Sequence, residues 1–73
     1  EKKIKIAVID TGVDINHEYL KDVIGGGISF EYDEKYIFTS DNYCDYNGHG
    51  TACVSTIKNE FRNLKFFIVK IMD

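Results

Sequence analysis

A chain of 73 residues with 44% hydrophobic residues, five Phe and five Tyr has the composition of a globular domain or of part of one, which excludes a disordered chain. The net charge of −3, with Lys and Arg scattered along the chain, does not indicate a nucleic acid or an anionic membrane surface as a partner. No apolar run approaches the roughly 20 residues that span a bilayer. This segment has no signal peptide, so the sequence leaves a secreted and a cytoplasmic location equally open.

Three segments have the pattern of β-strands. Residues 4–9 are β-branched and almost all apolar, and they end at a turn-forming Asp-Thr-Gly, as a buried strand of a parallel sheet does. Residues 27–32 alternate between apolar and polar side chains after a run of glycines. Residues 66–72 form a second apolar run. These patterns predict three strands.

The segments between these strands contain one clear helix. Residues 17–24 allow a short helical turn, and residues 33–48 are polar and aromatic without a period, which predicts a loop. Within residues 49–61 the apolar side chains recur at helical spacing, and the run ends in polar residues. The order of elements predicts an α/β fold with a mainly parallel sheet of the doubly wound type, present as about three strands and one main helix.

Such a sheet needs cover on both faces, and one helix cannot provide it. We therefore expect residues 1–73 to be the front part of a larger domain. The alternative is a small domain that buries its strand faces in an oligomer.

Two residues stand where chemistry is expected. Asp10 directly follows a strand, and ligands of open α/β sheets gather beyond the carboxyl ends of the strands, although a turn-forming or helix-capping Asp is equally common there. His49 lies at or near the start of the predicted helix, and a glycine on each side lets another backbone or a substrate approach closely. Together the two side chains suggest a carboxylate that orients an imidazole, which is two-thirds of a nucleophilic triad.

Three motifs occur in a characteristic order along the chain: AVIDTGVDINHEYL at residues 7–20, NGHGTAC at 47–53 and FFIVKIMD at 66–73. The first resembles the catalytic-Asp segment of the subtilisin-like serine proteases, the subtilase family. The second resembles their catalytic-His segment, and the third resembles the strand that follows it. Because the three motifs span nearly the whole chain, the resemblance implies a partial subtilase catalytic domain over residues 1–73.

The resemblance also implies roles for individual residues. Asp10 would be the acid of an Asp-His-Ser triad and His49 its general base, in the order acid, base, nucleophile. Six further residues would shape the turn after Asp10 or seat His49 at the helix start: Thr11, Gly12, Asp14, Gly48, Gly50 and Thr51. A complete triad hydrolyses peptide bonds through an acyl-enzyme, so the expected partners are a peptide or protein substrate and the rest of the catalytic domain or a complementary chain.

Several positions depart from the family's usual pattern. Ala52 stands where the family usually has a second His, and Cys53 lies beside the catalytic region, where thiol-dependent behaviour is conceivable. Tyr19 stands where many subtilisins have a calcium-binding Asp, and a phenol cannot replace that carboxylate. We therefore predict no cofactor for this segment, although the resemblance allows calcium elsewhere in a full domain. Whether Cys44 and Cys53 form a disulfide stays open.

The nucleophile is missing from these 73 residues. Ser55 lies six residues after His49, about 240° around the helix and about 9 Å along its axis, so it cannot reach the imidazole. Ser29 lies within a predicted strand, and Ser40 lies in the predicted loop. This chain alone is therefore expected to be inactive, because the members of a triad act as a unit.

Two other functions are consistent with the residues. A truncated relative that acts as a non-catalytic binding or assembly module would explain the short chain and the absent serine. A metal site on Asp10, His49, Asp45 and Cys44 is the weaker alternative, because these spacings match no zinc pattern.

Overall fold

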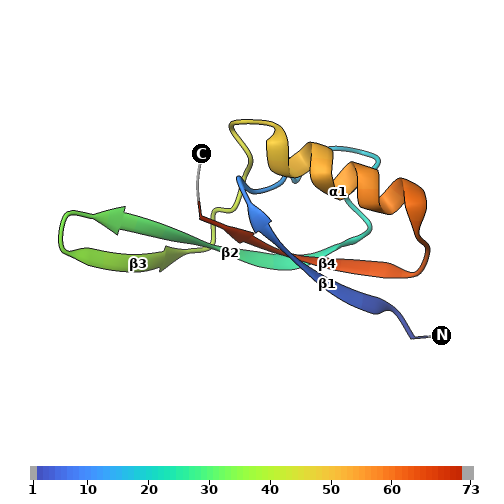
Figure 1. The fold of residues 1–73 in the computed structure, drawn as a ribbon, viewed down its shortest axis with the longest axis horizontal. Helices are drawn as coiled ribbons and strands as arrows, with labels where there is room; N and C mark the ends of the chain where they lie inside the picture. Colours follow the sequence, from blue (N-terminus) through green and yellow to red (C-terminus); the bar gives the residue numbers. More distant parts are fainter. Residues whose placement is uncertain (1, 72–73) are drawn as a thin grey trace.

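The computed structural model describes residues 2–71, which form a four-stranded sheet with one helix on one of its faces (Figure 1). The elements in chain order are β1 (Ile4–Asp10), β2 (Ile24–Asp33), β3 (Tyr36–Ser40), α1 (His49–Glu60) and β4 (Leu64–Lys70). Across the sheet the order is β1-β4-β2-β3. Strand β4 pairs in parallel with β1 and with β2, whereas β3 pairs antiparallel with β2. The predicted α/β fold with a mainly parallel sheet is confirmed.

The core lies between α1 and one face of the central strands. In β4 every second residue, beginning with Leu64, is buried. The buried apolar side chains of the described residues are Val8, Val13, Leu20, Val54, Leu64, Phe66 and Ile68. Each full burial of a side chain of this size contributes roughly 1.5–3 kcal/mol to folding. This core holds the end of β1 and the start of α1 next to each other.

The opposite face of the sheet is largely uncovered. Ile9 of β1 is 60% exposed, and Phe67 of β4 is 38% exposed. Residues 4–9 form the predicted strand, but the prediction that this strand is buried was wrong, since only Val8 is buried there. The physical reason is that α1 covers only one face of the sheet. The prediction of a single helix already implied that the other face lacks cover.

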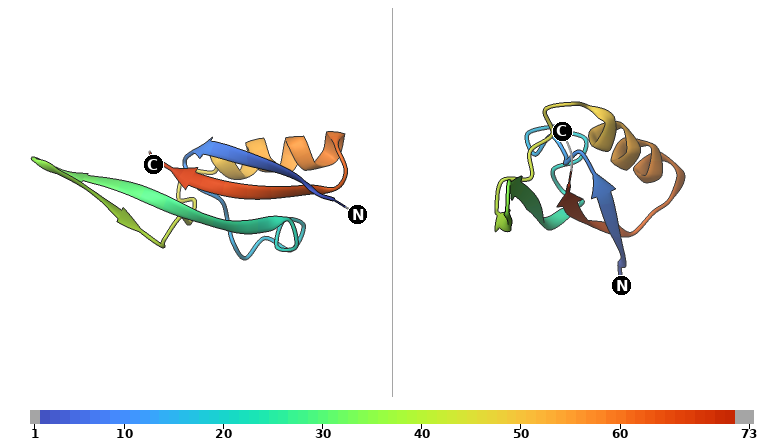
Figure 2. Two further views of the ribbon diagram at one scale, coloured as in Figure 1. Left: turned by 90° about the horizontal axis from the view of Figure 1, so that it is seen from below. Right: turned by 60° about the vertical axis from the view of Figure 1, so that its left-hand side comes forward.

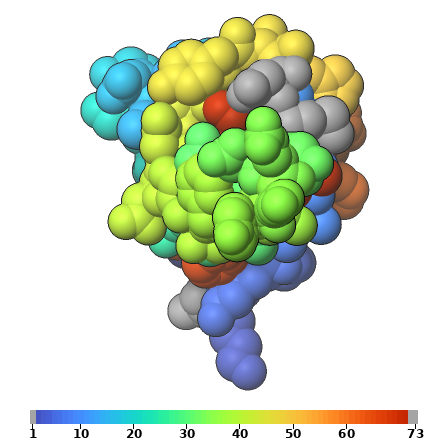
Figure 3. Space-filling model, turned by 90° about the vertical axis from the view of Figure 1, so that its left-hand side faces the viewer, coloured from blue at the N-terminus to red at the C-terminus, as the bar shows by residue number. Residues whose placement is uncertain are grey.

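The largest difference from the predicted elements is a β-hairpin. The segment 33–48 was predicted as a loop, but Tyr36–Ser40 forms β3 and pairs with β2 from Asp33 to Ser29. The connecting turn is Glu34–Lys35, with Glu34 at a φ of 43°, and it lacks the Asn-Gly or Asp-Gly signal of hairpin turns. Both faces of β3 are exposed, so its sequence shows no alternation. The hairpin extends away from α1 (Figure 2), and it faces the viewer in Figure 3.

The other boundaries differ by a few residues. Strand β2 begins at Ile24 instead of 27, and β4 runs over Leu64–Lys70 instead of 66–72, of which Met72 lies outside the described residues. The predicted helical turn over 17–24 is a series of hydrogen-bonded turns that ends where β2 begins. Among residues 2–71, no helix has the length and apolar character needed to cross a membrane.

Candidate active site

The carboxyl end of β1 and the amino end of α1 bring Asp10 and His49 together. Asp10 is the last residue of β1, and His49 is the first residue of α1. Nδ1 of His49 lies 2.9 Å from Oδ1 and 2.9 Å from Oδ2 of Asp10. The His49 side chain is 67% exposed, whereas that of Asp10 is 15% exposed. The acid is therefore held within the fold, while the imidazole faces outward.

The surroundings of Asp10 favour its ionised form. The hydrogen bond from His49 lowers the pKa of Asp10 below its usual value, more than the small desolvation raises it. The Thr11 backbone N–H also donates to Oδ1 at 2.7 Å. An ionised carboxylate can only accept hydrogen bonds, so the proton of the neutral imidazole belongs on Nδ1. Nε2 is then left as a hydrogen-bond acceptor.

Asp45 is the hub that joins the end of β1 to the start of α1. Its carboxylate accepts five hydrogen bonds, three of them from backbone N–H groups of Asn47, Gly48 and Thr51, at 2.8–3.0 Å. The other two come from the hydroxyls of Thr11, at 2.9 Å, and Thr51, at 2.6 Å. Burial alone would raise the pKa of Asp45, but these hydrogen bonds outweigh it and hold that pKa far below its usual range.

The two threonine hydroxyls extend this connection in both directions. While donating to Asp45, Oγ1 of Thr11 accepts the N–H of Gly50 at 2.8 Å, and Oγ1 of Thr51 accepts the N–H of Asp14 at 2.9 Å. Thr11, which follows β1, thus binds the backbone of the helix, and Thr51 of the helix binds the backbone of the segment after β1. We call the side chains of Asp45, Thr11 and Thr51 the Asp45 clamp. It sets the distance between Asp10 and His49 through short contacts on both sides.

The glycines around His49 have different roles. A Cβ on Gly50 would lie 2.1 Å from the carbonyl oxygen of Gly12, so the first helical turn packs directly on the backbone after β1. Gly48 has a φ of 105° and nothing within 4 Å of a built Cβ. A glycine is needed at this position because the backbone before the helix is left-handed, and not because a side chain would clash with a neighbour. Only Gly50 provides the close backbone approach that the sequence suggested for both.

Most of the predicted site residues meet at this junction, and one important residue does not come from the prediction. The clamp contains the predicted Thr11 and Thr51, and Asp14 and Gly12 contact the helix start. The sequence indicated Asp45 only as a candidate metal ligand, yet both of its carboxylate oxygens accept the hydrogen bonds of the clamp. Its position shortly before a helix start, where backbone N–H groups attract a carboxylate, is the signal that could have identified it.

Cys53 is the third side chain beside the acid and the imidazole. Its Sγ lies 3.7 Å from Oδ2 of Asp10 and 3.7 Å from Nδ1 of His49. Burial raises the pKa of the Cys53 thiol, and the negative charge of Asp10 adds to that effect. Cys53 and Cys44 are both free thiols, so they do not form a disulfide with each other in this structure.

Tyr19 packs against the helix instead of presenting an oxygen to a cation. Its hydroxyl donates to the side chain of Asn59, and the Lys58 ammonium lies 4.0 Å from the centre of its ring. Lys58 also pairs with Asp22 at 3.4 Å. This position therefore joins the turns after β1 to the end of α1.

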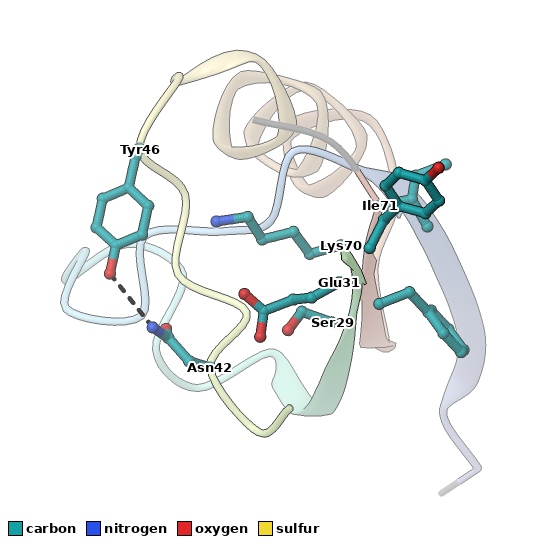
Figure 4. Close-up of a pocket in the computed structure, with 8 residues that line it drawn as sticks. Ser29, Glu31, Asn42, Tyr46, Lys70 and Ile71 are labelled. Carbon is teal, nitrogen blue, oxygen red and sulfur yellow. Dashed lines mark hydrogen bonds between the residues drawn. The ribbon is translucent and has the colours of Figure 1, made fainter. Parts of the chain in front are cut away.

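A pocket of about 480 Å³ lies at the carboxyl end of β4, between β2 and the segment before α1 (Figure 4). Ser29, Glu31, Asn42 and Tyr46 are among the residues that line it. Lys70 also lines it, and its ammonium donates to the carbonyl oxygen of Cys44 at 2.7 Å and lies 4.4 Å from the centre of the Tyr46 ring. Neither Asp10 nor His49 contributes to the lining, but Lys70 pairs with Asp10 across the sheet and the Ile71 N–H donates to the carbonyl oxygen of Asp10 at 3.0 Å, so the pocket adjoins the candidate active site.

The sequence that forms this site matches a known protein family over almost the whole chain. Residues 1–69 match the model of the subtilase family, peptidase family S8. The chain belongs to the subtilase family. The resemblance inferred from the three sequence motifs is thereby confirmed.

Individual relatives give the same result. The chain is 48% identical over 56 residues to the major intracellular serine protease of Bacillus subtilis (strain 168), covering 77% of this chain and 17% of that protein. It is 44% identical over 54 residues to the intracellular serine protease of Paenibacillus polymyxa, covering 74% and 16%. It is 42% identical to subtilisin-like protease 2 of Plasmodium falciparum (isolate 3D7), covering 77% and 4%. The chain therefore spans less than a fifth of the length of these relatives.

Proposed function

We propose that residues 1–73 are the front part of a subtilase catalytic domain and supply the acid and the base of a serine endopeptidase. The observation that carries the proposal is the contact of 2.9 Å between Nδ1 of His49 and the carboxylate of Asp10, made by a strand end and a helix start. Membership of the subtilase family supports the same assignment.

In the proposed reaction His49 acts as the general base. Its Nε2 takes the proton of a serine hydroxyl while the serine oxygen attacks the carbonyl carbon of a peptide bond. Asp10 stabilises the imidazolium that forms, and the imidazolium then gives its proton to the leaving amine. In the second half, Nε2 takes a proton from water, the hydroxide attacks the acyl-enzyme, and the serine recovers its proton.

The serine of this reaction comes from outside residues 1–73. Ser29 is buried in β2, where its hydroxyl donates to the carbonyl oxygen of Ser40 at 3.4 Å. The Ser40 hydroxyl accepts the N–H of Asn42, and Ser55 points to another side of α1 than His49. We therefore propose that the partners of this chain are a peptide or protein substrate and the remainder of the catalytic domain or a complementary chain. The uncovered sheet face of Ile9 and Phe67 supports that partner.

Labelling with a fluorophosphonate tests the proposal in the protein that carries this chain together with a serine-bearing remainder. His49→Ala is expected to lower the rate of labelling by at least about 10³-fold, because the base activates the nucleophile. Asp10→Ala is expected to lower it less, and His17→Ala, the matched control at the other histidine, is expected to leave it unchanged. Labelling of His49→Ala at the full rate would contradict the assignment of the base.

A further inference from the structure

Asp10, His49 and Cys53 present three different donor atoms to one point. The carboxylate oxygen, the imidazole Nδ1 and the Cys53 Sγ all lie within 4.8 Å of one another. Sγ is 3.7 Å from Oδ2 and 3.7 Å from Nδ1, and Nδ1 is 2.9 Å from Oδ2. His49 and Cys53 are four residues apart in α1, so their side chains share one face of the helix.

These separations are close to the edges of a tetrahedral zinc site. With Zn–S at about 2.3 Å and Zn–N and Zn–O at about 2.0–2.1 Å, a tetrahedron has S···N and S···O edges of about 3.6 Å and an N···O edge of about 3.3 Å. The two edges at Sγ already have nearly this length. The edge between His49 and Asp10 must open by about 0.4 Å, which follows when the proton that joins the two groups is replaced by a larger ion.

We propose that Asp10, His49 and Cys53 form a site for a divalent ion of borderline softness, with Zn²⁺ as the preferred ion. The combination of carboxylate, imidazole and thiolate suits zinc, whereas calcium and magnesium prefer oxygen ligands alone. Three protein ligands leave one tetrahedral position for a water molecule.

Binding of the ion displaces protons from the side chains of His49 and Cys53. Binding releases the proton of Nδ1 and the proton of the Cys53 thiol, and Asp10 turns from a partner of the imidazole into a ligand of the ion. In the proposed endopeptidase the ion would then be a reversible inhibitor, because Asp10 could no longer orient His49 or stabilise its charged form. This consequence rests on the proposed function, but the metal site itself does not.

Titration with Co²⁺, a spectroscopic substitute for Zn²⁺, tests the site in the protein that carries this chain. We expect visible bands of tetrahedral cobalt, a thiolate-to-cobalt charge-transfer band in the near ultraviolet, and loss of both on addition of Zn²⁺. Cys53→Ser is expected to abolish the charge-transfer band and, because Cys53 is a direct ligand, to weaken binding by more than the roughly 10–100-fold typical of an outer-shell substitution. Cys44→Ser, the matched control, is expected to keep the band and the affinity.

Unchanged cobalt bands in Cys53→Ser would overturn the site, and so would loss of the charge-transfer band in Cys44→Ser. If Cys53→Ser does not fold, as judged by circular dichroism, His49→Ala replaces it as the test, because the exposed imidazole can be removed without opening the core. Full retention of cobalt affinity in His49→Ala would also overturn the site. Fluorophosphonate labelling without metal is measured separately, so failure of the metal site and failure of the proposed protease are distinguishable.

Discussion

The junction between β1 and α1 and the hairpin of β2 and β3 are held in opposite ways. At the junction the carboxylate of Asp45 accepts five hydrogen bonds, and Gly50 packs against the backbone of Gly12. In the hairpin large side chains point into solvent: Phe30, Tyr32, Tyr36, Ile37 and Phe38 are 42–76% exposed. Dense short-range contacts therefore surround the acid and the base, while the hairpin is joined to the rest of the molecule by strand pairing.

This difference shows what determines the relative position of Asp10 and His49. Asp10 and His49 are 39 residues apart in the sequence, and their contact depends on the short connections of the clamp. A change at the junction should therefore alter both stability and the site, whereas a change in the hairpin should alter neither. Substitutions at the junction and in the hairpin test this contrast.

Gly50→Ala should have the largest effect. Its Cβ would lie 2.1 Å from the carbonyl oxygen of Gly12, which is backbone and cannot rotate away. We expect a loss of about 3 kcal/mol in the free energy of unfolding, in spite of the better helix propensity of Ala. Urea denaturation measures this loss, and an unfolding free energy equal to that of the wild type would contradict the close packing.

Asp45→Asn should cost about 2 kcal/mol. The amide places an NH₂ group opposite donors of the clamp, so at least one buried N–H or hydroxyl loses its acceptor. Asp41→Asn is the matched control, since Asp41 is exposed and lies four residues earlier in the same segment. Thermal unfolding of both variants compares them. Equal melting temperatures of the two variants would show that the clamp does not stabilise the junction.

The pH dependence of stability should also reveal the clamp. Because the pKa of Asp45 in the folded protein is held far below its unfolded value near 3.8, the ionised form stabilises the fold above that value. As the pH falls below about 5, this contribution is lost progressively, and Asp10, whose pKa is also lowered, acts in the same direction. Asp45→Asn should flatten the decrease measured by urea denaturation between pH 5 and 2; a decrease as steep as in the wild type would contradict this.

Gly48→Ala should have a smaller effect than Gly50→Ala. Nothing lies within 4 Å of a Cβ at Gly48, so the cost comes only from its φ of 105°. Adopting a left-handed conformation costs an Ala about 1–2 kcal/mol. Gly50→Ala should exceed Gly48→Ala when both are measured by urea denaturation, and the reverse order would refute the separate roles of the two glycines.

Ile37→Thr in the hairpin should have almost no effect. Ile37 is 73% exposed, and Thr keeps the β-branched shape that suits a strand. The free energy of unfolding should change by less than about 0.5 kcal/mol, and the cobalt and fluorophosphonate measurements should not change. A loss above about 1 kcal/mol would show that the hairpin is part of the stabilising core.

The contact between Asp10 and His49 could be predicted from the sequence because the local signals of both residues are strong. A β-branched run that ends in Asp10 and a glycine-flanked His49 at a helix start are patterns of neighbouring residues. For Asp45, the position before the helix start indicates the bonds to backbone N–H groups, but the bond from Thr11, 34 residues away, could not be predicted because the two residues meet only in the fold. Long-range hydrogen bonds of this kind leave little trace in a single sequence.

The hairpin was not predicted for a related reason. The alternation that identifies a strand requires one buried face, and β3 has both faces largely exposed. The exposure of Ile4 and Ile9 has the opposite origin, since an apolar run indicates burial whether or not the covering element is present. The sequence therefore describes a sheet with more cover than residues 2–71 provide.

The arrangement of the site requires the Asp10 carboxylate to hold the proton of a neutral His49 on Nδ1. Long-range ¹H–¹⁵N NMR of the imidazole rings tests it directly, with His17 as the internal reference. At a pH where His49 is neutral, we expect a protonated Nδ1 and an unprotonated Nε2, and loss of this preference in Asp10→Ala with no change at His17. A His49 that is protonated on Nε2, with the same spectrum in Asp10→Ala, would show that Asp10 does not orient the imidazole.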